Sequence, residues 1–123
     1  MANINIRSTR TEPAPLLALM KQLDPFLHYH PVAVNTRYVI SAQQQSQCYF
    51  VRSGAISMYR QPDDILIDLF DAPTLRGVIS LPADTLSTYI IKTIVPSEIA
   101  ILEREKLFAL LTEHNLWELF SRH

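Results

Sequence analysis

Hydrophobic and polar positions along the chain follow a helical period near the N-terminus. Two prolines, Pro13 and Pro15, stand where the first turn of a helix tolerates them. The apolar residues that then recur at helical spacing are Leu16, Leu17, Met20, Leu23 and Leu27. We predict a short amphipathic helix that ends near Asp24-Pro25, preceded by a flexible polar arm over residues 1–12.

From about residue 32 the pattern changes to short β-rich runs separated by turn signals. Ser53-Gly54 reads as a tight hairpin connection between two of these runs. The predicted strands cover residues 37–40, 48–52, 55–60, 65–70, 75–81, 88–95 and 99–102. Seven or eight short strands at this spacing favour a sandwich or a barrel-like roll.

A helical period returns after Leu102. Leu107, Leu110 and Leu111 share one face of a helix that begins near Glu103 and is broken at His114-Asn115. A second apolar helix then opens with Leu116, Trp117, Leu119 and Phe120. This helix stops at His123 without a cap or an evident partner, so we expect a chain cut inside a longer helix. Its apolar side chains suit either core packing or a dimer contact.

Composition supports one folded domain. Of the 123 residues, 48% are hydrophobic and 19% charged, so the chain can bury enough apolar surface to offset its ordering entropy. No apolar run reaches the ~20 residues that cross a bilayer, and the N-terminus lacks the apolar middle of a signal peptide. We therefore expect a cytoplasmic protein with no membrane partner. The net charge of −1 and the scattered basic residues argue against direct DNA contact by this segment.

The rarity of glycine and cysteine excludes several kinds of site. Only Gly54 and Gly77 occur, so glycine-rich phosphate loops are absent. Only Cys48 occurs, so neither a disulfide framework nor a four-cysteine iron–sulfur cluster fits. The sequence also shows no Ser-His-Asp, Cys-His or paired-carboxylate arrangement. We expect a protein that is not an enzyme and holds no cofactor.

Three stretches resemble a known family. Residues 48–56 are similar to a hairpin of the form apolar-x-apolar-x-x-Gly-x-apolar, residues 65–70 stand where the next strand is expected, and residues 99–111 resemble the last strand and the helix after it. Together they resemble the effector domain of the CRP/FNR superfamily, which has the cyclic-nucleotide-binding fold. The resemblance covers about residues 14–123.

The resemblance implies a mainly β fold with flanking helices, a jelly-roll-like double-stranded β-helix. Residues 13–113 would form this β-roll with its helices, and residues 114–123 would begin a truncated dimerisation helix. It also implies a homodimer of the full-length protein, held through Leu116, Trp117, Leu119 and Phe120. DNA would be bound only through a C-terminal winged-helix domain missing from this chain.

The phosphate-binding cassette is where the chain departs from the family. Cyclic-nucleotide binders show Phe-Gly-Glu and, several residues on, Arg-Ala or Arg-Ser. Backbone amides and the arginine hold the phosphate, and the glutamate takes the ribose hydroxyl. Here no glutamate follows Gly77, and Ser87-Thr88 stands where the arginine pair would fall. We therefore expect no cyclic-nucleotide binding.

The cassette region still contains candidates for a pocket. Arg76 is the residue best suited to meet an anionic effector; the alternatives are a solvated arginine or an ion pair with Asp68, Asp71 or Asp84. The polar residues that would line such a pocket, or simply occupy turns and strand faces, are Ser80, Thr85, Ser87, Thr88 and Tyr89. The sequence does not name the effector.

Cys48 is a candidate redox thiol. It shares strand parity with Phe50 and Arg52, so the Arg52 guanidinium would lie on the same face and lower the thiol pKa. The alternative is a buried, inert thiol.

His28 and His30 form the only His-x-His pair, a spacing found in metal sites. A cupin-like metalloenzyme would need a further histidine and a nearby glutamate on later strands. No glutamate lies between residues 13 and 97, so we expect an ordinary helix-to-strand junction and no metal.

These observations favour a non-enzymatic sensor domain of a CRP/FNR-like transcription regulator. The alternatives are a cupin-like metalloenzyme and a stand-alone interaction domain.

Overall fold

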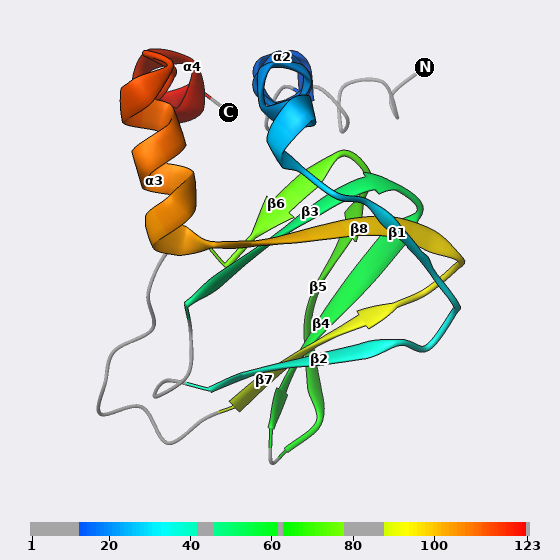
Figure 1. Ribbon diagram of the computed structural model, residues 1–123. Helices are drawn as coiled ribbons and strands as arrows, with labels where there is room; N and C mark the ends of the chain where they lie inside the picture. Colours follow the sequence, from blue (N-terminus) through cyan, green and yellow to red (C-terminus); the bar gives the residue numbers. More distant parts are fainter. Residues whose placement is uncertain (1–12, 42–45, 62, 78–87, 123) are drawn as a thin grey trace, which may run out of the picture.

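A computed structural model describes residues 13–41, 46–61, 63–77 and 88–122. The elements alternate as the sequence predicts, helix first, strands next and helices last (Figure 1). In chain order they are α2 (Pro13–Leu23), the 3-10 helix η1 (Asp24–Phe26), β1 (His30–Val32), β2 (Arg37–Ser41), β3 (Gln47–Ser53), β4 (Ala55–Gln61), β5 (Ile65–Asp71), β6 (Thr74–Arg76), β7 (Thr88–Thr93), β8 (Ser97–Glu103), α3 (Arg104–Glu113) and α4 (Trp117–Ser121). The predicted arm over residues 1–12 lies outside the described residues.

The strands form two four-stranded antiparallel sheets. Sheet A has the order β1-β8-β3-β6, and sheet B has the order β2-β7-β4-β5. Figure 1 shows the helices beside sheet A, with sheet B on its other side. The predicted mainly β fold with flanking helices is therefore confirmed.

β3, a strand of sheet A, packs against the helices on one face and against sheet B on the other. Cys48 and Phe50 lie in the cluster against the helices, whereas Tyr49 and Val51 lie in the cluster between the two sheets. Side chains alternate between the faces of a strand, so an unbroken apolar run is what a strand buried on both faces requires. All four side chains are buried.

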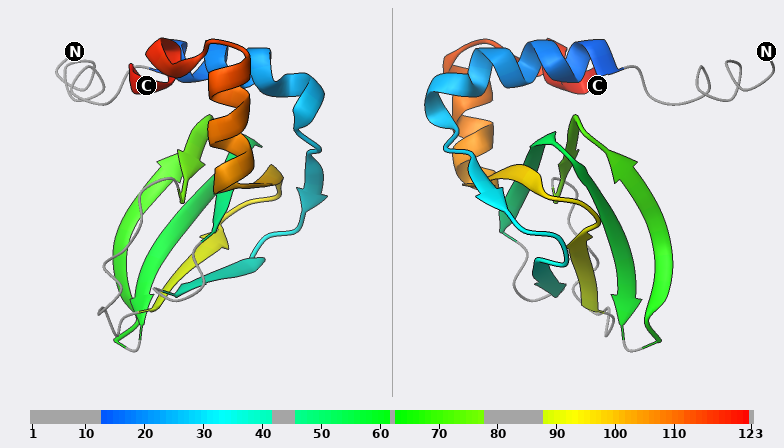
Figure 2. Two further views of the ribbon diagram at one scale, coloured as in Figure 1. Left: turned by 60° about the vertical axis from the view of Figure 1, so that its left-hand side comes forward. Right: turned by 90° about the vertical axis from the view of Figure 1, so that its right-hand side faces the viewer.

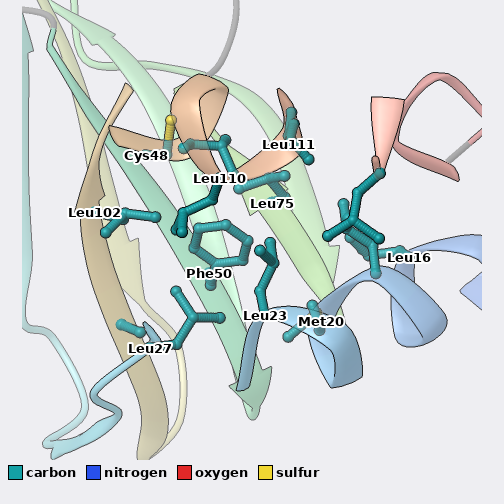
Figure 3. Packing of buried hydrophobic residues seen from close by; sticks show 14 residues of the cluster. Leu16, Met20, Leu23, Leu27, Cys48, Phe50, Leu75, Leu102, Leu110 and Leu111 are labelled. Carbon is teal, nitrogen blue, oxygen red and sulfur yellow. The ribbon is translucent and has the colours of Figure 1, made fainter. Parts of the chain in front are cut away.

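The helix-side cluster is the larger of the two. Phe50 lies at its centre and is fully buried, between Leu23 of α2 and the leucines of α3 (Figure 3). The α2 residues that line it, Leu16, Leu19, Met20 and Leu23, have the spacing of one helix face. Burying one large apolar side chain stabilises the fold by about 1.5–3 kcal/mol, so packing in this cluster is the main interaction that holds the helices on sheet A.

One predicted connection is wrong. Ser53-Gly54 does not close a hairpin, because β3 pairs only with β6 and β8, and β4 pairs only with β5 and β7. The Ser-Gly pair instead carries the chain from sheet A to sheet B. Gly54 has a φ of 99°, and a Cβ added there would collide with Ser97 of β8. The corner therefore needs both the conformational freedom of glycine and its lack of a side chain.

Other strand boundaries differ in detail. The short strand β1 was not predicted from the sequence; it pairs with β8 through His30↔Ile99 and its neighbours. The strand expected over residues 75–81 is described only as Thr74–Arg76, because residues 78–87 lie outside the described part. β7 ends at Thr93 rather than residue 95, where its buried hydroxyl donates to the Ala33 carbonyl and accepts the Thr36 amide.

The C-terminal segment has a partner within the chain. α4 lies beside α2 (Figure 2), and Leu116 belongs to the helix-side cluster with Leu119 and Phe120 packed against it. The expectation that this apolar set lacks a partner is therefore wrong for these three residues. Trp117 differs: it stays 42% exposed, packs against the tilted Phe108 ring and meets the Phe120 ring edge to face. No helix in the described ranges is long and apolar enough to cross a membrane.

We predict that Gly54→Ala destabilises the protein by about 2–3 kcal/mol, because alanine is strained at this φ and its methyl group meets Ser97. Urea unfolding measures the change. Asn35→Gly is the matched control, since Asn35 also has a positive φ, of 67°, but glycine adopts that conformation freely. A Gly54→Ala variant as stable as the control would show that the corner can move aside.

Candidate functional site

The candidate site lies inside the roll, where β6 faces sheet B. β6 pairs with β3 so that Arg76 is opposite Tyr49 and Leu75 is opposite Phe50. Leu75 therefore points to the helices, and the alternation of the strand turns Thr74 and Arg76 toward the space between the sheets. The predicted anion-binding residue Arg76 is thus half-buried on the inner face of sheet A.

The guanidinium of Arg76 is held by an aromatic ring rather than by a carboxylate. Its Cζ lies 3.6 Å from the centre of the Phe70 ring, and its Nε donates to Thr74 Oγ1 at 3.1 Å. Burial lowers the pKa of Arg76, and the charge of Asp68 partly opposes this. Neither Asp68 nor Asp71 forms an ion pair with it, and Asp84 lies outside the described residues.

The other predicted pocket residues do not all gather at Arg76. Tyr89 packs against the cluster between the sheets, as Phe70 does. Thr88 is its neighbour in β7, so strand alternation places Thr88 on the opposite, outer face of sheet B. The expectation that Thr88 lines the pocket is therefore wrong. Ser80, Thr85 and Ser87 lie outside the described residues.

An arginine that sequence reasoning missed holds the start of the cassette. The carbonyl of Gly77 accepts hydrogen bonds from Nη2 and Nε of Arg104, at 3.0 and 3.3 Å. Gly77 has a φ of 93°, and a Cβ there would collide with the Gln47 carbonyl. Arg104 begins α3 directly after β8, and this position between two elements was the only signal in the sequence.

Cys48 is a core residue. Its side chain is 0% exposed, and burial raises its pKa to about 11, partly offset by the charge of Arg104. The predicted influence of Arg52 is wrong. Both residues face the helix side, but they are four positions apart along the strand, about 13 Å between their Cα atoms. The structure thus favours the buried, inert thiol over the redox thiol.

Arg52 has other partners. Its Nη2 donates to Glu98 at 3.0 Å, its guanidinium lies 4.0 Å from the centre of the Tyr29 ring, and Asp24 lies at the edge of ion-pair range. These contacts connect the segment that follows α2 to sheet A. The charged groups are exposed, so we assign them a positioning role of small energy.

The His28/His30 pair forms the helix-to-strand junction that the sequence suggested. Both side chains are exposed, and His30 begins β1. Among the described residues, no three His, Cys, Asp or Glu side chains lie close enough to hold a metal ion.

We predict that iodoacetamide alkylates Cys48 in the folded protein at pH 8 at least about 100-fold more slowly than an exposed thiol, because the buried thiol stays protonated. The pKa in the folded state, about 11, exceeds the ordinary 9.0, so the protonated thiol favours folding below pH 9 and loses this contribution as the pH rises through 11. Mass spectrometry follows the labelling.

The matched control is Val39→Cys in a Cys48→Ala background, since Val39 is 63% exposed. Equal labelling rates for the two thiols would contradict the assignment of Cys48 to the core.

No protein-family model and no curated protein sequence matches the chain. Solved structures do match. The c-di-GMP-responsive regulator CLP of Xanthomonas campestris superposes with a TM-score of 0.64 at 18% identity, over 90% of this chain and 53% of that one. A crystal structure of CprK gives a TM-score of 0.65 at 14% identity, over 85% of this chain and 53% of the other.

Shorter proteins match as well. The N-terminal domain of a transcriptional regulator from Streptomyces coelicolor gives a TM-score of 0.59 at 14% identity, over 83% of this chain and 72% of that domain. The EAL enzyme Bd1971 gives 0.54 at 10% identity, over 70% and 79% of the two chains. The chain spans about half the length of CLP and CprK. At these identities the likeness shows the fold alone: two four-stranded antiparallel sheets with flanking helices, shared with CLP, CprK and the Streptomyces regulator domain.

Proposed function

We propose that this chain is a non-enzymatic sensor domain of a cytoplasmic CRP/FNR-like bacterial transcription regulator. The observation that carries the proposal is the fold shared with CLP and CprK, which are about twice as long. In this proposal the domain positions a winged-helix DNA-binding domain that follows residue 123. The sequence also resembles the enterobacterial CRP-like regulator of hydrogen-peroxide resistance, and we extend the proposal to that group.

The effector pocket of the proposed sensor is unsuited to cyclic nucleotides. No glutamate follows Gly77 to take a ribose hydroxyl, and no arginine replaces Ser87 to pair with a phosphate. The Gly77 carbonyl is already bound by Arg104. Any anionic effector would be met instead by Arg76, which lies over the Phe70 ring and whose Nη atoms lack a carboxylate partner among the described residues.

Two alternatives are less well supported. A cupin-like metalloenzyme needs a set of metal ligands, and the exposed His28 and His30 have no third ligand near them in the described ranges. A stand-alone interaction domain would share the fold but lack a DNA-binding partner. Whether the reading frame encodes a winged helix after His123 separates that alternative from the proposal.

We predict that titration calorimetry shows no binding of cyclic AMP or cyclic GMP at millimolar ligand, because the groups that would hold the phosphate and ribose are missing. CLP with cyclic di-GMP, to which it is described as responsive, is the positive control. Micromolar affinity of this chain for either mononucleotide would refute the prediction.

We further propose that the full-length regulator is a homodimer whose contact runs along the helix that begins at α4. Leu116, Leu119 and Phe120 are used inside the chain, so Trp117 is the apolar side chain of this set that remains for a partner. Its indole N–H already donates to Thr112 at 2.8 Å, and this bond fixes the exposed ring. Large aromatic side chains fixed in this way are typical centres of interfaces.

We predict that Trp117→Ala weakens the full-length dimer by at least about tenfold, equivalent to about 1.4 kcal/mol, while the isolated 123-residue chain dimerises weakly or not at all. Sedimentation equilibrium measures both. Val34→Thr, which removes a 46% exposed apolar side chain from a distant turn, should leave the dimer unchanged. A full-length monomer, or a dimer indifferent to Trp117, would show that this segment serves only the core.

A further inference from the structure

The outer face of sheet B carries an apolar row that no part of the described chain covers. Its inner residues Ile40, Ile56 and Ile91 fill the cluster between the sheets. The alternate residues face outward. Register places four of these directly opposite one another across all four strands: Val39, Ile90, Tyr59 and Leu66.

This row is an exposed surface rather than an extension of the core. Val39 is 63% exposed, Leu66 is 48% exposed, and the nearby Leu69, also on the outer face, is 53% exposed. Three strand spacings make the row about 14 Å long. Scattered apolar residues are ordinary on a protein surface, but contiguous ones mark a place where another surface binds.

Two cations stand beside the row without a counter-charge. Arg37 and Lys92 are direct cross-strand partners in the β2–β7 pair, next to Val39 and Ile90. Like charges placed opposite each other destabilise a sheet. Neither forms an ion pair within the described residues; Lys92 instead lies 5.0 Å from the centre of the Tyr59 ring. An acidic partner would relieve this repulsion.

Strand addition is hindered at one of the two edges of sheet B. The edge strands are β2 and β5, and the register of β5 shifts by one residue between Met58 and Tyr59 of β4, a bulge that interrupts regular pairing. The backbone N–H of Leu69 donates to the Asp68 carboxylate at 2.7 Å. The backbone groups of a sheet bond to neighbouring strands, so a partner that covers the face of sheet B contacts side chains only. Such a partner must satisfy its own backbone hydrogen bonds, as a helix does.

We infer that the outer face of sheet B binds an acidic amphipathic helix of a partner protein. The apolar stripe of the helix lies on the row formed by Val39, Ile90, Tyr59 and Leu66, and its carboxylates flank the stripe on the side of Arg37 and Lys92. A second copy of this chain fits less well. If two copies pack face to face about a two-fold axis that runs along the strands, Arg37 of one copy lies over Leu69 of the other. If the axis runs across the strands through the row, Arg37 lies over Ser41 of the other copy. Neither arrangement places a carboxylate opposite Arg37.

The test uses two designed helical peptides of about 20 residues with the same leucine stripe. One carries glutamates beside the stripe and the other lysines. We expect the acidic peptide to bind the 123-residue chain at least about tenfold more tightly than the basic peptide, with an affinity that falls as salt is added. Amide shifts in NMR spectra should move at Val39, Tyr59, Leu66 and Ile90.

Two double variants separate the contribution of the apolar row from that of the two cations. Val39→Thr with Leu66→Thr should weaken binding of the acidic peptide at least about tenfold. Arg37→Glu with Lys92→Glu should reverse the preference, so that the basic peptide binds more tightly. Leu17→Thr is the matched control, because it removes a 52% exposed apolar side chain from α2, which lies on the other side of the molecule from the row. Circular dichroism verifies that each variant folds.

The inference is overturned if neither peptide binds, if both bind equally, or if the amide shifts map elsewhere. Self-association of the chain that the Val39→Thr, Leu66→Thr variant abolishes would also overturn it, by assigning the face to a second copy.

Discussion

β3 is buried on both of its faces, and the other layers depend on that constraint. Phe50 fixes the helices to one side of sheet A, and Val51 fixes sheet B to the other. Two clusters therefore share one strand, so a void on one face disturbs the packing of the other. A strand in this position has no surface to offer a ligand, and the functional groups of the domain must come from the elements around it.

The short strand β6 supplies those groups because only its alternate residues are needed for the core. Leu75 goes to the helix-side cluster, whereas Arg76 is left facing the interior of the roll. A few residues away, Arg104 holds the Gly77 carbonyl and connects the start of α3 to the start of the cassette. A shift of the Gly77 carbonyl would therefore reach α3 through a direct hydrogen bond, and α3 leads into α4. This is a short physical route between the proposed effector pocket and the proposed dimer helix.

The two exposed apolar regions differ in what surrounds them. Trp117 stands among aromatic rings on α3 and α4 with its polar N–H satisfied, a surface suited to close apolar packing. The row on sheet B is bordered by Arg37 and Lys92, a surface suited to a partner of opposite charge. The two regions lie on opposite sides of the molecule, since the helices cover sheet A and the row belongs to the outer face of sheet B (Figure 2). Both could be occupied at once.

The sequence by itself determined the order of elements and the class of fold, because the period of the apolar residues follows directly from helix and strand geometry. It also determined that no glutamate follows Gly77 and that Ser87 stands where the resemblance would place an arginine, since missing residue types need no structure to be seen. Only the tertiary structure decided which strands pair. Period-two alternation is the same for every partner, so Ser53-Gly54 was equally compatible with a hairpin and with a crossing between sheets. The surroundings of Cys48 were undecided for a related reason: parity gives the face of a residue, but only the packed fold brings Arg104 closer to it than Arg52.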